Sequence, residues 1–268
     1  MPVQATRLSV PVETRAPTGE TGACVLGADP ALLVDPPAAS DRLDAVTDQR
    51  GVGHVAVTHH HPDHVGGVAR YAERHDATVW ARTGREAAFD RATGIAPDRT
   101  LREGTTIPTG NGPVRVVDTP GHAPEHVAFA HGDDLACGDL AVAEGSVAVA
   151  APEGDLRAYL TSLRRVHALN PEQLLPGHGP VIEDVRPTVE RLVAHRLDRE
   201  RRVLAAVEAG ARTVRAVCDR AYEKDLTGVR DLAEATVRAH LEKLAVEGRV
   251  QWEGDEARPQ RGPRIRER

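Results

Sequence analysis

Short apolar and alternating runs, separated by Gly and Pro, dominate the first half of the chain and are typical of β-strands. The pattern predicts strands at residues 7–14, 21–27, 30–37, 53–58, 77–81, 112–120, 126–132 and 134–139. Apolar residues recur at helical spacing over residues 41–49, 68–75 and 156–170. Because strand pairs occur together with strand–helix alternation, we expect a mixed α/β sandwich rather than a purely doubly wound sheet.

After about residue 184 the pattern becomes almost entirely helical. Three helical segments, 189–210, 213–222 and 232–248, precede a short strand-like run at 249–254. Three helices with a terminal β element resemble a winged helix. We therefore expect a large α/β domain over 1–184 and a small winged-helix-like domain over 185–253. We expect the tail over 254–268, which is Arg- and Pro-rich and lacks periodicity, to be disordered.

Composition narrows the class of protein. No apolar run approaches the roughly 20 residues of a membrane span, and the N-terminus lacks the hydrophobic stretch of a signal peptide. The three cysteines are widely spaced and odd in number, which argues against a disulfide framework. We therefore expect a cytosolic protein that does not bind membranes, and the oligomeric state stays open. The net charge is −6 although the terminal segment 258–268 carries five Arg and one Glu. The rest of the chain is therefore more acidic still, at about −10, which argues against a broad nucleic-acid-binding face.

The stretch VAVTHHHPDHVGG, residues 55–67, holds four histidines and one aspartate directly after an apolar run. If that run is a strand, His59 and His61 project from the same face at its end, and His60 points the other way. Pro62 ends the ladder, so Asp63 and His64 fall in a turn. A solvated polar loop is the alternative, but the spacing of these side chains around one point favours a metal site.

Three downstream segments add further ligand types at strand ends. His122 lies in a Pro/Gly turn after one strand, Asp139 follows another, and His178 lies between glycines after a short apolar run. Each alone is readily explained as a loop residue. Their conjunction with the histidine-rich stretch favours a site at the sheet edge, where α/β proteins commonly bind ligands.

This order of motifs resembles the metallo-β-lactamase fold superfamily over most of residues 20–184. The resemblance implies an αββα sandwich with a two-metal hydrolytic site. It implies that the first metal is held by His59, His61 and His122, and the second by Asp63, His64 and His178, with Asp139 bridging the two. The segment LLVDPP departs from the family pattern, which usually has Gly soon after the Asp, but it lies outside the ligand set.

Five imidazoles and two carboxylates suit two Zn²⁺ ions per chain, and Fe or Mn is compatible with the same ligands. Two ions about 3.5–4 Å apart can share one hydroxide whose pKa falls to about 7, and this hydroxide is the expected nucleophile. Asp63 is the expected catalytic residue, because it should orient the hydroxide while binding metal.

Two other histidines are candidates for the surroundings of the site. His126 either supports a ligand or contacts substrate, with a role inside its strand as an equal alternative. His195 lies on a charged helical face that is either solvated or reaches toward the substrate. Cys137 is interpreted as a small buried side chain. The remaining histidines are interpreted as surface or satisfied core residues, namely His54, His60, His75, His131, His167 and His240.

The C-terminal segments and the stretch CGDLAVAEGSVAV are similar to the beta-lactamase-like protein 2 group, extending the resemblance to about residues 20–252. Relatives in that group include a single-strand-selective endoribonuclease, so the resemblance implies single-stranded RNA or a small molecule as substrate. The third predicted helix carries more acidic than basic residues, which argues against sequence-specific DNA binding.

Four functions remain in competition. A phosphodiesterase or endoribonuclease is favoured by the resemblance over the whole chain. A thioesterase of the hydroxyacylglutathione hydrolase type uses the same metal set for acyl transfer. A true β-lactamase is disfavoured because no secretion signal is visible. A non-catalytic nucleic-acid-binding regulator is disfavoured by the intact ligand set and the acidic third helix.

Overall fold

The computed structural model describes residues 5–223 and 225–260, which fall into two compact units. Unit 1 contains the described residues of Met1–Pro120, Glu125–Val147 and Ser162–Glu190. Unit 2 contains those of Gly121–Pro124, Ala148–Thr161 and Arg191–Arg268. Two short segments, 121–124 and 148–161, thus belong with the C-terminal residues, and the domain boundary expected at residue 184 stays a prediction.

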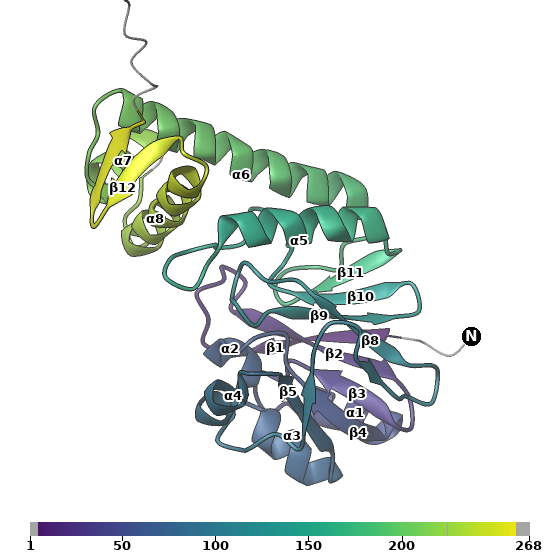
Figure 1. Ribbon diagram of the computed structural model, residues 1–268. Coiled ribbons are helices and arrows are strands. Elements are labelled where there is room, and N and C mark those ends of the chain that lie inside the picture. The colour runs from purple at the N-terminus through teal and green to yellow at the C-terminus, as the bar shows by residue number, and fades with distance from the viewer. Residues whose placement is uncertain (1–4, 224, 261–268) are drawn as a thin grey trace, which may run out of the picture. The chain divides into compact units, whose positions relative to one another are not determined.

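The first sheet of unit 1 has six strands in the order β1-β2-β3-β4-β5-β6 (Figure 1). The first three strands are antiparallel, and β3 to β6 run parallel. Parallel strands end at the same edge of a sheet, so the segments that follow β3 and β4 lie near each other. The strands are β1 (Ala5–Pro11), β2 (Glu20–Gly27), β3 (Ala31–Val34), β4 (Val52–Ala56), β5 (Thr78–Arg82) and β6 (Arg99–Leu101).

The second sheet of unit 1 has five strands in the order β11-β10-β9-β8-β7. Only the β10–β11 pair is parallel. The segments after β10 and β11 therefore leave the sheet side by side. The strands are β7 (Thr106–Ile107), β8 (Val114–Asp118), β9 (Val127–His131), β10 (Asp134–Gly138) and β11 (Gln173–Pro176).

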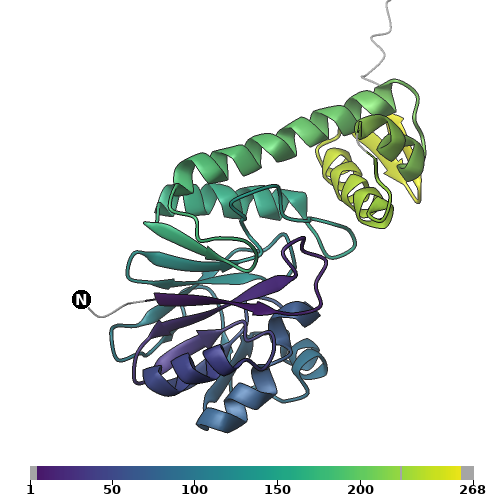
Figure 2. The ribbon, with the colours of Figure 1, turned by 180° about the vertical axis from the view of Figure 1, so that it is seen from behind.

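The two sheets pack face to face, with helices on the outer faces (Figures 1 and 2). Alternation along β2 shows why: Cys24 and Leu26 belong to a core shared with Val116 and Phe129 of the second sheet. Val25 points the other way and packs under the helices with Tyr71 and others. The helices of unit 1 on that side are α1 (Asp41–Arg50), α2 (Pro62–Val65), α3 (Val68–His75) and α4 (Glu86–Thr93).

The expected helices at 41–49 and 68–75 are confirmed by α1 and α3. Helix α1 ends at Gly51, whose φ of 61° lets its N–H bond back to the carbonyl groups of Thr47 and Asp48. The sequence pattern did not predict α4, β6 or β7. Of the α4 side chains only Phe89 is buried, and β6 and β7 have three and two residues, so none shows a periodicity.

From Arg191 on, the described residues of unit 2 form three helices followed by a two-stranded hairpin, and their apolar residues form a separate core. This agrees with the expected order of elements, while the winged-helix assignment stays a proposal. Residues 256–259 were expected in the disordered tail but form a strand paired with residues 250–253; residues 261–268 of that tail lie outside the described part of the chain. The elements, some of which begin or end in unit 1, are α5 (Leu156–Leu169), α6 (Val185–Glu208), α7 (Val214–Ala221), α8 (Arg230–Val246), β12 (Val250–Glu253) and β13 (Glu256–Pro259).

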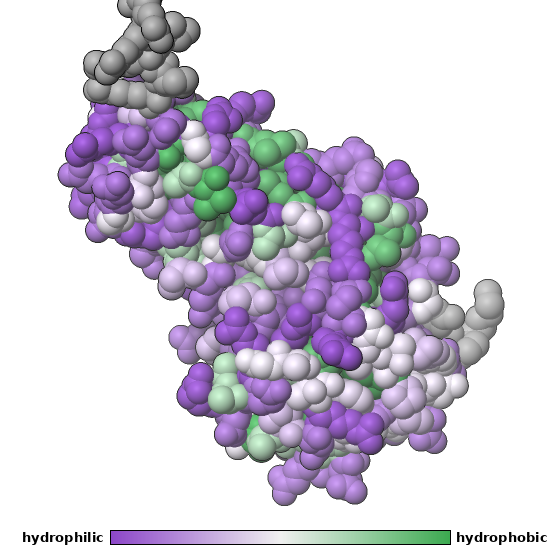
Figure 3. Space-filling model, viewed as in Figure 1, coloured by the Kyte–Doolittle hydropathy of each residue, from purple (hydrophilic) through white to green (hydrophobic). Residues whose placement is uncertain are grey.

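The described residues contain no helix with the length and hydrophobicity of a membrane span. Figure 3 shows a mostly hydrophilic face with apolar residues in small, separate groups. The expected absence of a disulfide framework is confirmed, because Cys24, Cys137 and Cys218 are free and buried.

Candidate metal centre

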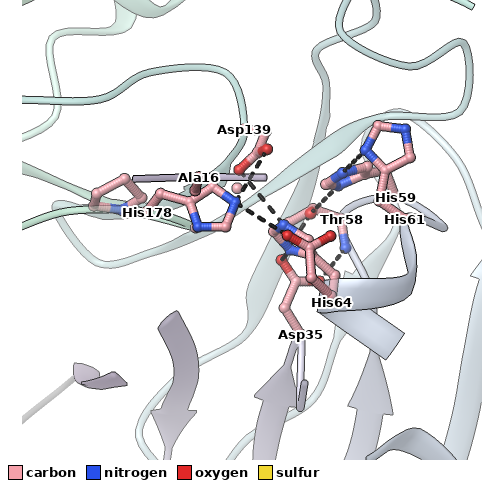
Figure 4. A network of polar contacts seen from close by, with 12 residues as sticks. Ala16, Asp35, Thr58, His59, His61, His64, Asp139 and His178 are labelled. Carbon is pink, nitrogen blue, oxygen red and sulfur yellow. Dashed lines mark hydrogen bonds and ion pairs between the residues drawn. The ribbon is translucent and has the colours of Figure 1, made fainter. Parts of the chain in front are cut away.

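Four strand ends of unit 1 bring polar side chains to one place (Figure 4). Asp35 follows β3, and the histidine-rich stretch follows β4. Asp139 follows β10, and His178 lies two residues beyond β11. The parallel pairs β3–β4 and β10–β11 direct these segments toward the same edge of the sandwich.

The local conformation of residues 57–65 differs in two respects from the expected one. Strand β4 ends at Ala56, so His59 and His61 lie in the loop beyond it rather than at its end. Asp63 and His64 lie in the one-turn helix α2 rather than in a turn, because Pro62 is at the first helical position, where its missing N–H costs nothing. His59 and His61 still face each other, with His59 Nε2 2.9 Å from His61 Nδ1.

His60 is directed away from this pair. Its ring packs edge-on against Phe89, and its Nδ1 lies 3.6 Å from the Glu125 carboxylate. Burial lowers the pKa of His60, which favours the neutral form. His60 thus stabilises the loop that carries its two neighbours.

Asp35 is the main residue of the site that sequence analysis placed outside the functional set. It is 2% exposed, and its carboxylate accepts hydrogen bonds from the Thr58 backbone N–H at 2.6 Å and the Thr58 hydroxyl at 2.7 Å. The same carboxylate lies 3.0 Å from His64 Nδ1. A buried strand that ends in a lone Asp, as LLVD does, was the signal that could have identified it.

These hydrogen bonds fix the tautomers of two imidazoles. Asp35 accepts the proton of His64 Nδ1, so the lone pair of the neutral ring lies on Nε2. The Thr58 hydroxyl gives its proton to Asp35 and therefore accepts from His59 Nδ1 at 3.0 Å, which leaves the His59 lone pair on Nε2. Each ring therefore has its lone pair on Nε2, the nitrogen through which it could bind a metal ion.

Asp139 lies between two imidazoles. One carboxylate oxygen is 3.5 Å from His64 Nε2, and the other is 3.5 Å from His178 Nε2. His126 orients Asp139 through a hydrogen bond to its backbone. Its Nε2 accepts the Asp139 backbone N–H at 3.2 Å, so its Nδ1 donates to the Thr119 hydroxyl at 2.8 Å.

His178 is held by contacts with the first sheet. Its Nδ1 donates to the Glu20 carbonyl oxygen at 2.9 Å, and its Nε2 lies 3.5 Å from an Asp63 carboxylate oxygen. Arg7 of β1 donates to the Pro176 carbonyl oxygen at 2.7 Å, which fixes the start of the His178 loop. The loop backbone must approach closely, because a Cβ on Gly177 would lie 2.4 Å from an Asp139 oxygen.

His122 and His195 belong to unit 2. The His122 side chain is 9% exposed, and its Nδ1 donates to the Ala148 carbonyl oxygen at 2.7 Å, so its lone pair lies on Nε2. His195 lies on α6 among arginines. Burial and the neighbouring Arg196 and Arg199 lower the pKa of His195 to about 4.

Two groups of donors in unit 1 could each hold a metal ion. Within each group, one ligand atom per residue lies within 4.8 Å of the others. The groups are His59, His64 and Asp139, and Asp63, His64 and His178. Among the described residues His64 Nε2 has no hydrogen-bond partner although it is buried, as expected of an atom that binds an ion.

Electrostatics favour a cation at this position. Burial by itself would lower the pKa of His64, but the carboxylates of Asp139 and Asp35 raise it to about 9. Burial likewise opposes protonation of His178, and the hydrogen bond to Asp139 outweighs it and raises the pKa. A metal ion binds the same imidazole nitrogens as a proton does. The carboxylates that favour the protonated imidazoles therefore also favour a divalent ion at this position.

Comparison with known proteins agrees with this geometry. The family model described as "Metallo-beta-lactamase superfamily" matches residues 19–178. The "Beta-lactamase-like protein 2 homolog" of Drosophila melanogaster is 32% identical over 215 residues, covering 76% of this chain and 72% of the fly protein.

Two further similarities concern the chemistry. The "Hydroxyacylglutathione hydrolase" of Acidiphilium cryptum is 34% identical over 187 residues, covering 69% of this chain and 72% of the relative. A crystal structure described as TTHA1623 in a di-iron-bound form is 32% identical with a TM-score of 0.51, covering 68% of this chain and 98% of that one.

Proposed function

Because the chain belongs to the metallo-beta-lactamase superfamily, we propose that it is a hydrolase that uses two divalent metal ions, with zinc as the preferred metal. The observation that carries this proposal is the pair of overlapping donor groups in unit 1, which share His64. The structure described as di-iron-bound supports two ions in this fold and makes iron the second choice of metal.

The donors divide between two ions. We assign His59, His61 and His122 to the first ion, as the resemblance to the superfamily implies. We assign Asp63, His64 and His178 to the second ion, with Asp139 shared. This assignment is supported by the tautomers, because His59, His64 and His122 each direct a protonated Nδ1 at a protein oxygen.

Bound divalent ions lower the pKa of a coordinated water to about 7 and stabilise a developing oxyanion. The residues supply orientation and proton handling. Asp63 presents a carboxylate that can accept a proton from the attacking water, and it is the residue we assign to catalysis. Asp35 holds the His64 ring in one orientation, and His126 fixes the backbone of Asp139.

For the substrate we propose a phosphodiester, either in single-stranded RNA or in a small molecule. The support for this choice is the resemblance to the beta-lactamase-like protein 2 group, whose relatives include a single-strand-selective endoribonuclease; the fly homolog matches 76% of this chain. The acidic chain weakens electrostatic capture of a polyanion, so we expect low affinity for long RNA with cleavage governed by the metal site.

A sequence-specific DNA reader is disfavoured by the charges of α8 in unit 2. Its basic side chains are already paired: Arg238 lies 2.7 Å from Asp255, and Lys243 lies 2.7 Å from Glu200. Arg230 is similarly paired with Asp219 at 2.6 Å. A helix that grips phosphates should present unpaired positive charge, so we propose that the winged-helix-like domain has another role.

The thioesterase of the hydroxyacylglutathione hydrolase type is the second candidate. The 34% identity with the Acidiphilium cryptum enzyme favours it, and the same donors can serve acyl transfer. A non-catalytic regulator is the weakest candidate, because it does not need the paired carboxylates and imidazoles.

A substrate panel distinguishes these functions. Zinc-loaded protein is assayed with a single-stranded oligoribonucleotide, bis(p-nitrophenyl) phosphate, S-lactoylglutathione and a chromogenic β-lactam, with His61→Ala as the matched inactive control. We expect turnover of the phosphodiesters by the parent protein only. Rapid hydrolysis of S-lactoylglutathione with inert phosphodiesters would replace the phosphodiesterase by the thioesterase, and no hydrolysis of any ester would overturn both.

A further inference from the structure

Asp63 has a hydrogen-bond partner far away in sequence. The Thr14 hydroxyl lies 2.5 Å from the Asp63 carboxylate, across 49 residues of chain. The carboxylate oxygen that Thr14 contacts, Oδ2, is the one that lies 3.5 Å from His178 Nε2. Thr14 therefore contacts the oxygen that faces the other members of the second donor group.

The direction of this hydrogen bond follows from its partners. A carboxylate only accepts, so the Thr14 hydroxyl donates its proton to Asp63, while the hydroxyl oxygen accepts from the Ala16 backbone N–H at 3.1 Å. A hydroxyl that donates to a carboxylate at this distance forms a charge-assisted hydrogen bond, which is stronger than one between neutral groups.

The loop that carries Thr14 is itself fixed. It joins β1 to β2 and is closed by two hydrogen bonds, Val12 N–H to the Gly19 carbonyl oxygen and Gly19 N–H to the Ala16 carbonyl oxygen, each at 3.1 Å. Thr14 is half-buried, so its side chain is less free than an exposed one. The sheet edge thus provides a fixed position from which the hydroxyl reaches α2.

Every imidazole of the second donor group has a protein partner that orients it. His64 is bonded to Asp35, and His178 is bonded to the Glu20 carbonyl oxygen. Asp63 sits on a helix of one turn, and its side chain is 16% exposed, so its carboxylate needs a comparable constraint. The Thr14 hydroxyl provides it.

We propose that Thr14 is a positioning residue that aims the Asp63 carboxylate at the second metal ion, an inference that rests on the proposed two-metal site. Loss of the hydroxyl leaves Asp63 free to rotate, which weakens the second ion and slows turnover without changing how substrate is bound. Partners that orient metal ligands typically contribute 10–100-fold in metal affinity or activity, and we expect about this range.

The test compares Thr14→Val with Thr14→Ser. Thr14→Val keeps the shape and removes the hydroxyl, whereas Thr14→Ser keeps the hydroxyl. Thr6→Val is the matched control, because Thr6 is also half-buried and its hydroxyl also bonds a charged side chain, that of Arg50 at 2.9 Å. Zinc affinity is measured by competition with a chromogenic chelator, and kcat and KM are measured on the best substrate of the panel.

We expect the second zinc equivalent of Thr14→Val to bind about 10–100-fold more weakly, with the first equivalent unchanged. We expect kcat to fall while KM holds, and Thr14→Ser and Thr6→Val to behave like the parent. Two-zinc binding by Thr14→Val with parental affinity and kcat overturns the role of Thr14 alone. A parent protein that binds no zinc overturns the two-metal proposal, and the role of Thr14 with it.

Discussion

The carboxylate of Asp35 lies 3.0 Å from Nδ1 of His64, and both side chains are almost completely buried. The same carboxylate accepts two hydrogen bonds from Thr58, so one group satisfies three buried donors. It determines which nitrogen of His64 faces the candidate metal site. Asp35 thus contributes to stability and to metal binding through one set of contacts.

Replacing Asp35 should destabilise the protein. Asp35→Ala leaves the Thr58 donors and the His64 imidazole without their acceptor, and we expect a loss of about 3–5 kcal/mol in the free energy of unfolding. Asp35→Asn keeps one acceptor and should cost about 1–3 kcal/mol. Urea denaturation of metal-free protein measures both, with the exposed Asp133→Ala as control; equal stability of all three variants would contradict this role.

Asp139 should control metal content. Its two carboxylate oxygens face His64 and His178, two assigned ligands of the second ion, and we assigned Asp139 itself as the ligand shared by both ions. Asp139→Ala therefore removes one proposed ligand from each ion. Elemental analysis of protein purified without chelator should find close to two equivalents, mostly zinc, in the parent and about one in the variant. Asp133→Ala, which removes an exposed carboxylate from the turn before β10, should keep both. An Asp139→Ala protein with parental metal content and rate would falsify the assignment.

His61→Ala and His122→Ala should each abolish turnover while the fold persists. Each removes one assigned ligand of the first ion, and the metal is expected to supply several kcal/mol of transition-state stabilisation, or a loss on the order of a thousand-fold in kcat. Circular dichroism should be unchanged, because both side chains lie in loops outside the apolar cores. His167→Ala, on α5 with a third of its side chain exposed, should retain activity; comparable rates for all three variants would exclude the first site.

Gly177→Ala tests the close approach of the His178 loop. A Cβ at this position would lie 2.4 Å from Asp139 Oδ1 and 2.6 Å from His64 Cε1, much nearer than real contacts allow. The neighbouring ligands must move, so we expect weaker binding of the second zinc equivalent, by about tenfold or more. Competition with a chelator measures this, and unchanged affinity would mean that the loop relaxes without disturbing the donors.

His195 should make the protein sensitive to acid. Burial, Arg196 and Arg199 lower its pKa to about 4 from 6.5, so the folded state resists protonation more than the unfolded state does. Stability is therefore retained above pH 6.5 and lost as the pH falls from about 6.5 toward 4. We expect the decrease in the free energy of unfolding between pH 6.5 and pH 4 to be about 1–2 kcal/mol smaller in His195→Gln than in the parent, allowing for solvent screening.

Thermal unfolding between pH 4 and pH 8 measures the effect of His195→Gln. His167→Gln is the control, because its ring is on α5 with a third of the side chain exposed and an ion pair to Glu190 at 2.9 Å. Identical acid sensitivity in the parent and His195→Gln would show that other groups cause the acid loss.

The sequence by itself determined the local features. Periodicity gave the helices at 41–49 and 68–75, because a helix or strand buries one face at a fixed spacing. The consecutive motif from His59 to His64 identified the candidate metal centre, because residues this close in sequence stay close in any compact fold. Elements of two or three residues, such as β6 and β7, show no spacing and were missed.

Only the tertiary structure decided which distant residues support the site. Asp35 reaches Thr58 and His64 because β3 and β4 pair in parallel and end at one edge. Thr14 reaches Asp63 because a hairpin loop closes above α2 from 49 residues away. The pairing register and the loop closure that create these contacts are properties of the packed chain, so no pattern of neighbouring residues encodes them.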